Sequence, residues 1–168
     1  GPFSSHEKQL SMLEKCSHTT TGSLGYRICG LKVWRYDGPN GQYKYRDLEW
    51  GRTLKASDMT AAMLEFVENG IDVRGDIFVK FLPRLLSLRA LLVSSPLYNF
   101  FGSSLLFVYE GDVTKPTKVD CRMVDFSHTY EIDSGIPDSQ YLFGLDNLIS
   151  LFGKLSKLAG QLNYNDTI

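Results

Sequence analysis

The chain has 168 residues, of which 18 are Lys or Arg and 19 are Asp or Glu, so its formal net charge is −1. Hydrophobic residues make up 43% of the sequence and charged residues 22%, which is typical of one globular domain and excludes a disordered chain. The balanced charge disfavours a nucleic-acid-binding protein or a membrane-surface module, because both usually carry a basic excess.

The first predicted element is a short helix near the N-terminus. Ser4 and Glu7 have the spacing of a capping box, in which the serine caps the helix and the glutamate bonds back to it. The helix is expected to run to about Lys15, with Lys8 on the same face as Lys15. Residues 19–22, three threonines and a glycine, are predicted to form a loop.

A β-hairpin is predicted next. Residues 24–36 are rich in β-branched and aromatic side chains, and residues 42–46 alternate between aromatic and polar side chains, so both segments are expected to be strands. Residues 37–41 between them are all turn-forming types.

Two helices are predicted in the middle of the chain. Ser57 is expected to cap the first, whose apolar residues recur at intervals of three and four until the turn at 69–70. The second is expected over 76–93, with a kink at Pro83. Its predicted buried face consists of Phe78, Phe81, Leu82, Leu85, Leu88 and Leu92.

The C-terminal part is predicted to contain a second hairpin and a last helix. Residues 102–110 and 119–126 are apolar runs separated by a polar loop at 112–118. The last helix is expected over 141–158. The order of elements predicts an α+β fold with two β-hairpins and flanking helices.

Cysteine content and hydropathy bear on the cellular compartment. The three cysteines are odd in number and widely spaced, which argues against a disulfide scaffold and favours a reducing compartment. We therefore expect a cytoplasmic or nuclear protein. The most apolar stretch, 77–93, contains three basic residues, so no membrane span is predicted. The cysteines are Cys16, Cys29 and Cys121.

The strongest chemical pattern lies at residues 123–128. Asp125 follows a predicted buried strand and precedes Phe126 and a turn, so rigid backbone would hold its carboxylate at the strand end. A kinase Asp-Phe-Gly element of this kind binds the Mg²⁺ that bridges nucleotide phosphates. Ser103 and Ser104 begin the partner strand and would lie beside the same nucleotide. The alternative is that Asp125 only caps a turn and the serines only begin a strand.

Five segments together resemble the inositol polyphosphate kinases, and their order and spacing agree with that family over nearly all of the chain. They are LGYRICGLKV at 24–33, GRTL at 51–54, SSLLFVYEG at 103–111, VDFSHT at 124–129 and YLFGLDNLI at 141–149. Residues 15–25 and the pair Cys29-Gly30 look most like the inositol hexakisphosphate kinase branch. The multikinase branch is close behind, and the trisphosphate 3-kinase branch is less similar.

The resemblance implies the C-terminal lobe of a protein-kinase-like fold and transfer of the ATP γ-phosphoryl group to an inositol polyphosphate. It implies that Asp125 is the Mg²⁺ ligand and that Ser104 and Leu105 contact the nucleotide. It also implies that His128 approaches the inositol ring and takes part in catalysis. For His128 a turn residue bonded to nearby backbone is an equal alternative.

A polyphosphate substrate needs cations, and the resemblance implies that Lys8, Lys15 and Arg52 supply them. Ordinary solvated surface charges are the alternative for the two lysines. For Arg52 the alternative is a structural bond to backbone carbonyl groups. Leu48 departs from the family, which often has Lys or Gln at this position, and this leaves the substrate branch open.

The family's signature, Pro-x-x-x-Asp-x-Lys-x-Gly, is not found in the 168 residues. Neither are the N-terminal lobe and its nucleotide-clamping lysine. We therefore expect residues 1–168 to form a single C-terminal lobe that has little activity without its N-terminal partner lobe, and Gly1-Pro2 to be the remnant of a cleaved tag. The alternative is a natural short form that binds inositol phosphates or another partner without catalysis.

Overall fold

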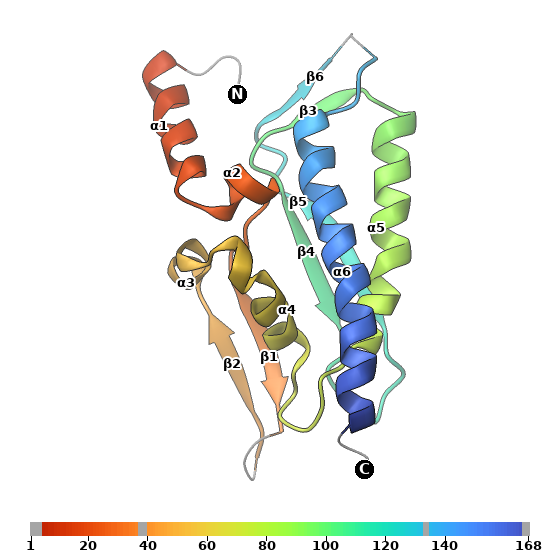
Figure 1. Ribbon diagram of the computed structural model, residues 1–168. Coiled ribbons are helices and arrows are strands. Elements are labelled where there is room, and N and C mark those ends of the chain that lie inside the picture. The colour runs from red at the N-terminus through yellow and green to blue at the C-terminus, as the bar shows by residue number, and fades with distance from the viewer. Residues whose placement is uncertain (1–4, 37–39, 133–134, 166–168) are drawn as a thin grey trace.

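The computed structural model describes residues 5–36, 40–132 and 135–165, without the side chains of residues 8, 9, 11–13, 15 and 159–165. Two groups of elements lie side by side (Figure 1). The first holds a β-hairpin and four short helices. In the second, two long helices pack together against a second hairpin. No helix of the described residues is both long and apolar enough to cross a membrane.

The N-terminal region contains more helix than the sequence predicts. Its elements are α1 (His6–Ser17), α2 (Thr20–Leu24), β1 (Leu31–Arg35) and β2 (Gln42–Arg46). Helix α1 ends two residues later than expected, and its predicted cap Ser4 lies outside the described residues. The loop prediction for 19–22 is wrong for residues 20–22, which begin α2, whereas Thr19 precedes the helix. Gly25 ends α2 in the left-handed region at φ 77°, where its N–H donates to Thr21 O, and glycine adopts this conformation without steric cost.

The first hairpin is confirmed, although β1 is shorter than the predicted strand. Strands β1 and β2 pair antiparallel, from Leu31 opposite Arg46 to Arg35 opposite Gln42. The predicted turn at 37–41 lies largely outside the described residues. The carboxylate of Glu65 in α4 (Met59–Val67) pairs with Lys44 at 3.1 Å and with Arg46 at 2.7 Å. These two ion pairs tie β2 to α4.

The middle of the chain holds α3 (Leu48–Thr53), the 3-10 turn η1 (Ala56–Asp58), α4 (Met59–Val67) and α5 (Asp76–Ser94). Helix α3 was not predicted; Asp47 caps it by accepting from Trp50 N at 2.9 Å. The prediction that Ser57 caps a helix is wrong, because Ser57 lies inside η1 and Asp58 precedes α4. Helix α5 agrees with its prediction to within a residue and contains Pro83.

The C-terminal elements are β3 (Tyr98–Phe100), β4 (Ser104–Tyr109), β5 (Val119–Val124), β6 (Thr129–Glu131) and α6 (Ser139–Asn165). The second hairpin, β4–β5, is confirmed. The short pair β3–β6 was not predicted. Helix α6 begins before, and ends after, its predicted limits.

The core lies between α5, α6 and one face of β4–β5. Phe78, Phe81 and Leu85 of α5 are fully buried, as predicted, and they pack with Leu148 and Phe152 of α6. The other predicted core positions of α5 are only partly buried. They are Leu82, Leu88 and Leu92. This packing fixes the hairpin, so the residues at its open end have a rigid support.

Candidate nucleotide and metal site

The candidate site lies where hairpin β4–β5 opens. Ser104 begins β4 and pairs with Val124, the last residue of β5, so Asp125 is the first residue beyond the ladder. The sequence correctly predicts that Ser104 and Asp125 share one end of the hairpin.

Asp125 is held by its own turn. It is the one non-glycine residue with positive φ in the described part of the chain, at 63°. Aspartate is among the few side chains that tolerate this left-handed region, because its short polar group bonds locally. Its Oδ1 accepts from Ser127 Oγ at 2.7 Å and from Ser127 N at 3.4 Å. The turn is closed by Thr129 N, which donates to Phe126 O at 3.2 Å.

These contacts keep Asp125 ionised. The Ser127 hydroxyl lowers the pKa of the Asp125 carboxyl, and the Ser127 backbone N–H and the nearby His128 act in the same direction. The carboxylate is exposed to solvent. Its second oxygen, Oδ2, accepts no hydrogen bond from the described residues. An anionic oxygen therefore faces outward at neutral pH.

The donor set fits a cation that arrives with a nucleotide. Among the described residues, no three His, Cys, Asp or Glu side chains gather into a group able to cage a metal. Mg²⁺ does not need such a cage, because it commonly binds one or two carboxylates plus phosphate and water oxygens. Asp125 and the Ser104 hydroxyl, which has no partner in the described structure, are oxygen donors of this kind.

Leu105 does not share the face of Ser104. Side chains alternate along a strand, and Leu105 packs against the core cluster. Leu106 lies on the face of Ser104 and is 51% exposed, and Val124 opposite Ser104 is 37% exposed. The apolar surface available to a nucleotide beside Ser104 is therefore Leu106 and Val124, in place of the predicted Leu105.

His128 stands next to this site. Its backbone oxygen accepts from Phe101 N at 3.1 Å, and its side chain is exposed. The imidazole has no hydrogen-bond partner in the described structure. The alternative of a hydrogen-bonded turn residue thus holds for the backbone of His128. Its imidazole stays exposed, as the predicted catalytic role requires.

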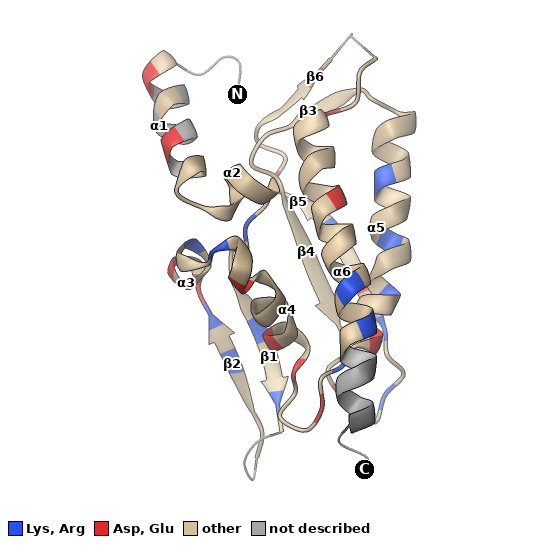
Figure 2. Cartoon of the chain, in the orientation of Figure 1, with Lys and Arg blue, Asp and Glu red and all other residues tan. Residues whose placement is uncertain are grey.

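Of the three predicted phosphate-binding cations, the structure describes the side chain of Arg52 alone. Arg52 lies in α3 and pairs with Glu49, one helical turn earlier, and not with backbone carbonyls. Lys8 and Lys15 lie in α1, but their side chains are outside the described part. Figure 2 shows Lys and Arg interspersed with Asp and Glu on several elements. Many of these cations are neutralised locally, in pairs such as Arg84–Asp120 and Arg89–Asp146.

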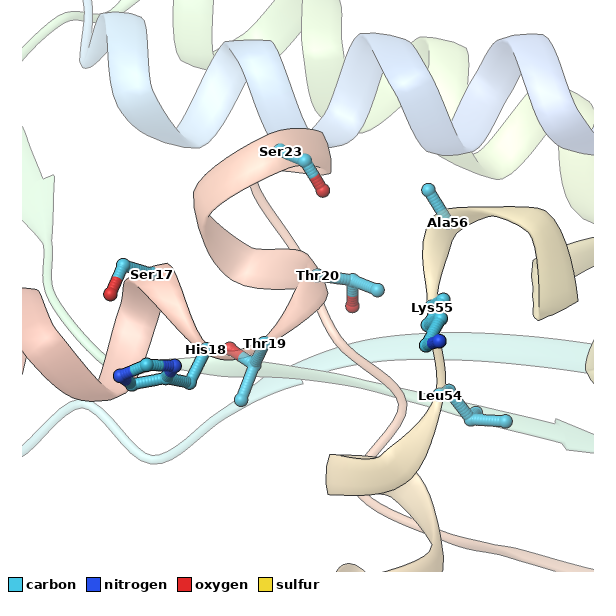
Figure 3. Close-up of a pocket in the computed structure, with 8 residues that line it drawn as sticks. All are labelled: Ser17, His18, Thr19, Thr20, Ser23, Leu54, Lys55 and Ala56. Carbon is cyan, nitrogen blue, oxygen red and sulfur yellow. The ribbon is translucent and has the colours of Figure 1, made fainter.

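A separate polar pocket of about 220 Å³ lies between the α1–α2 junction and the segment after α3 (Figure 3). Thr20 and Ser23 of α2 face Lys55 and Ala56 across it. The sequence interpretation did not identify Lys55, although it directly follows the motif at 51–54. The lining residues are Ser17, His18, Thr19, Thr20, Ser23, Leu54, Lys55 and Ala56.

The sequence interpretation also missed the role of Ser127. A serine two residues after an aspartate is a recognisable signal for a turn closed by the aspartate side chain. Here that turn sets both the direction and the charge of Asp125.

Comparison with known families supports the resemblance seen in the motifs. A family model described as inositol polyphosphate kinase matches residues 1–153. The chain belongs to the inositol polyphosphate kinase family.

Curated relatives of this chain include inositol hexakisphosphate kinases. Inositol hexakisphosphate kinase 1 of Rattus norvegicus is 31% identical over 198 residues, and inositol hexakisphosphate kinase 3 of Mus musculus is 33% identical over 173 residues. The alignments cover 92% and 90% of this chain but only 45% and 43% of those relatives. The chain thus spans a little under half the length of the curated relatives it matches.

Solved structures of inositol phosphate multikinases share the fold. One superposes with a TM-score of 0.82 at 25% identity, over 92% of this chain and 73% of the other. A multikinase from S. cerevisiae, solved with ADP and Mn²⁺, superposes with a TM-score of 0.79 at 23% identity, over 90% of this chain and 72% of the other. The predicted α+β, kinase-like architecture is confirmed.

Proposed function

We propose that this chain is the lobe of an ATP-dependent inositol hexakisphosphate kinase that binds the nucleotide-bound cation. The observation that carries the proposal is the outward-facing Asp125 carboxylate, held beside Ser104 in a chain of the inositol polyphosphate kinase family. Asp125 and Ser104 would hold Mg²⁺, which neutralises phosphate charge during phosphoryl transfer. The ADP and Mn²⁺ in the yeast multikinase structure support a site of this class.

The substrate we propose is inositol hexakisphosphate, with a diphosphoinositol phosphate as the product. The curated relatives at about 30% identity support this choice. The multikinase reaction is the second candidate, because both superposed structures are multikinases. Leu48 does not decide between them: it is 38% exposed at the start of α3, and an aliphatic side chain cannot bind phosphate.

We further propose that the chain has little or no kinase activity alone. Phosphoryl transfer depends on several groups acting together, and the family's Asp-x-Lys signature is not among the 168 residues. Incubation with ATP, Mg²⁺ and inositol hexakisphosphate should give no turnover above a blank. Robust turnover would contradict this proposal and would mean that these 168 residues suffice for catalysis.

Calorimetry separates the nucleotide site from a purely substrate-binding role. Titration of Mg²⁺–ATP into the chain should give measurable heat of binding. The absence of heat would argue against the nucleotide site. Titration of inositol hexakisphosphate tests the alternative of a non-catalytic anion-binding module. Micromolar binding weakened by Lys15→Ala would favour that alternative. A cytoplasmic or nuclear location remains part of the proposal, supported by three free cysteines.

A further inference from the structure

Asp138 divides its two carboxylate oxygens between a helix and a strand. Its Oδ1 accepts from Gln140 N at 3.1 Å and from Tyr141 N at 3.0 Å, which caps the start of α6. Its Oδ2 accepts from Phe100 N in β3 at 2.8 Å. A serine or asparagine cap would have one acceptor oxygen, so the second contact depends on the carboxylate.

The strand that Asp138 holds is directly connected to the candidate site. Phe101, the residue after Phe100, donates its N–H to His128 O at 3.1 Å. Phe100 also pairs with Thr129, the residue that closes the turn of Asp125. Asp138 is therefore linked to the strand and turn that carry His128 and Thr129, through the hydrogen bonds of Phe100 and Phe101 and the pairing of β3 with β6.

Aromatic packing follows the same path. The ring of Phe100 lies 5.6 Å from the ring of Tyr141 in the first turn of α6 and 6.2 Å from the ring of Phe126 in the turn. Beyond Phe101, a Cβ on Gly102 would meet no atom within 4 Å, so packing does little to place this link to Ser104. The hydrogen bonds that Phe100 N and Phe101 N donate to Asp138 and His128 thus help to fix it.

The β3–β6 pair needs such support. It has three residues in each strand, and an isolated two-stranded ribbon of this kind is marginal in water. Helix α6 supplies a rigid reference, because Leu145, Leu148 and Phe152 anchor it in the core.

We infer that Asp138 is a positioning residue, which ties β3 to α6 and thereby holds Ser104 and the Asp125 turn in the arrangement that binds the nucleotide-bound cation. This inference rests on the proposed function. Asp138 does not touch the nucleotide or the cation; it acts through Phe100, Phe101 and His128.

The test is Asp138→Ser in the full 168-residue chain. Serine retains the helix cap and loses the bond to Phe100 N, so the two roles are separated. The matched control is Asp47→Ser, which makes the same change at the cap of α3, where no strand is bound. Asp138→Ala removes both contacts.

Two measurements decide the outcome. Amide hydrogen exchange at Phe101 and Thr129 should become faster in Asp138→Ser, while Gln140 and Tyr141 in α6 keep their protection. Affinity for Mn²⁺–ADP should fall about tenfold, the scale expected for losing a hydrogen bond to a charged group. Asp47→Ser should change neither property.

Unchanged exchange at Phe101 and Thr129 in Asp138→Ser would overturn the inference. Faster exchange with unchanged Mn²⁺–ADP affinity would overturn it too, because binding at the turn would then not depend on the contact between Asp138 and Phe100. If the unaltered chain binds no Mn²⁺–ADP, the proposed function fails, and the exchange data alone decide whether Asp138 holds the turn.

Discussion

A close backbone contact between the two groups of elements joins α6 to the end of α2. A Cβ built on Gly144 would lie 2.5 Å from the Gly25 carbonyl oxygen, and one built on Gly25 would lie 2.7 Å from the Gly144 Cα and N. Asn147 fastens the same junction through Nδ2, which donates to Leu24 O at 3.0 Å. Neither position has room for a side chain, so Gly144→Ala must push α2 away from α6.

The size of the effect follows from two opposing contributions. Replacing glycine by alanine inside a helix gains about 1 kcal/mol of helix propensity. Overpacking against backbone costs about 1–3 kcal/mol, and more where the neighbour cannot yield. We therefore expect Gly144→Ala to lower the free energy of unfolding by up to about 2 kcal/mol, and by more if the backbone of α2 cannot yield.

Gly153→Ala is the matched control, because Gly153 lies in the same helix and no atom lies within 4 Å of its Cβ position. This substitution should stabilise the chain by up to about 1 kcal/mol. Urea unfolding followed by the fluorescence of Trp34 and Trp50 measures both changes. Equal stabilisation by the two substitutions would refute the contact between α2 and α6.

Two further predictions concern the core and an ion pair. Phe152→Ala should destabilise the chain by about 3–5 kcal/mol in the same urea assay, because Phe152 is fully buried. Phe143→Ala, at a 49% exposed site of the same helix, should cost less. A loss for Phe152→Ala below that of Phe143→Ala would contradict the packing. For Glu65, burial raises the pKa, but hydrogen bonds and charge from Arg46 and Lys44 more than offset it, so the folded-state pKa is lowered. Its contribution is therefore present above the ordinary glutamate value of 4.5 and is lost as the pH falls through the lower folded value. Glu65→Gln should therefore destabilise the chain more at pH 7 than at acidic pH below 4.5, and an equal loss at both would be inconsistent with the ion pair.

The sequence predicts the elements whose signal is local and periodic. Hairpins β1–β2 and β4–β5 show alternation and turn residues, and α5 has an apolar repeat over five turns, so all three were located. The strand predicted from residue 24, however, begins only at Leu31. Strands β3 and β6 have three residues each, which is too short for a period to be recognised.

The missed helices depend on tertiary contacts. Residues 20–24 contain threonines and a glycine and look like a loop, yet they become α2 because they pack on α6. Helix α3 contains Gly51, which usually breaks helices; here a Cβ on Gly51 would lie 2.0 Å from Ile28 O, so the close approach requires glycine. Contacts of this kind with distant residues leave no pattern in the local sequence.

The residues of the candidate site show the same difference between local patterns and distant contacts. Asp125 and Ser104 were identified because strand ends and motif spacing are visible in the sequence. The orientation of Leu105 was missed by one step of the strand alternation, and Asp138 was missed because its contact with Phe100 joins residues 38 positions apart. Arg52 was expected at the substrate, and its partner Glu49, three residues earlier, could have been read from the sequence only if a helix had been predicted there.

Binding of Mn²⁺–ADP to Asp125→Asn tests the central claim most directly. Asparagine tolerates the left-handed backbone and keeps an oxygen for Ser127, so the substitution removes the charge and leaves the turn. Asp112→Asn is the matched control, because Asp112 is also exposed and its Oδ1 accepts from Thr114 Oγ1 at 2.7 Å at the opposite end of the hairpin.

Electron paramagnetic resonance of the bound Mn²⁺ gives the affinity in each chain. Asp125→Asn should weaken binding at least about tenfold, as expected when a charge-assisted contact is lost, while Asp112→Asn should bind as the unaltered chain does. Equal affinity in all three chains would contradict the assignment of Asp125 as the residue that holds the nucleotide-bound cation.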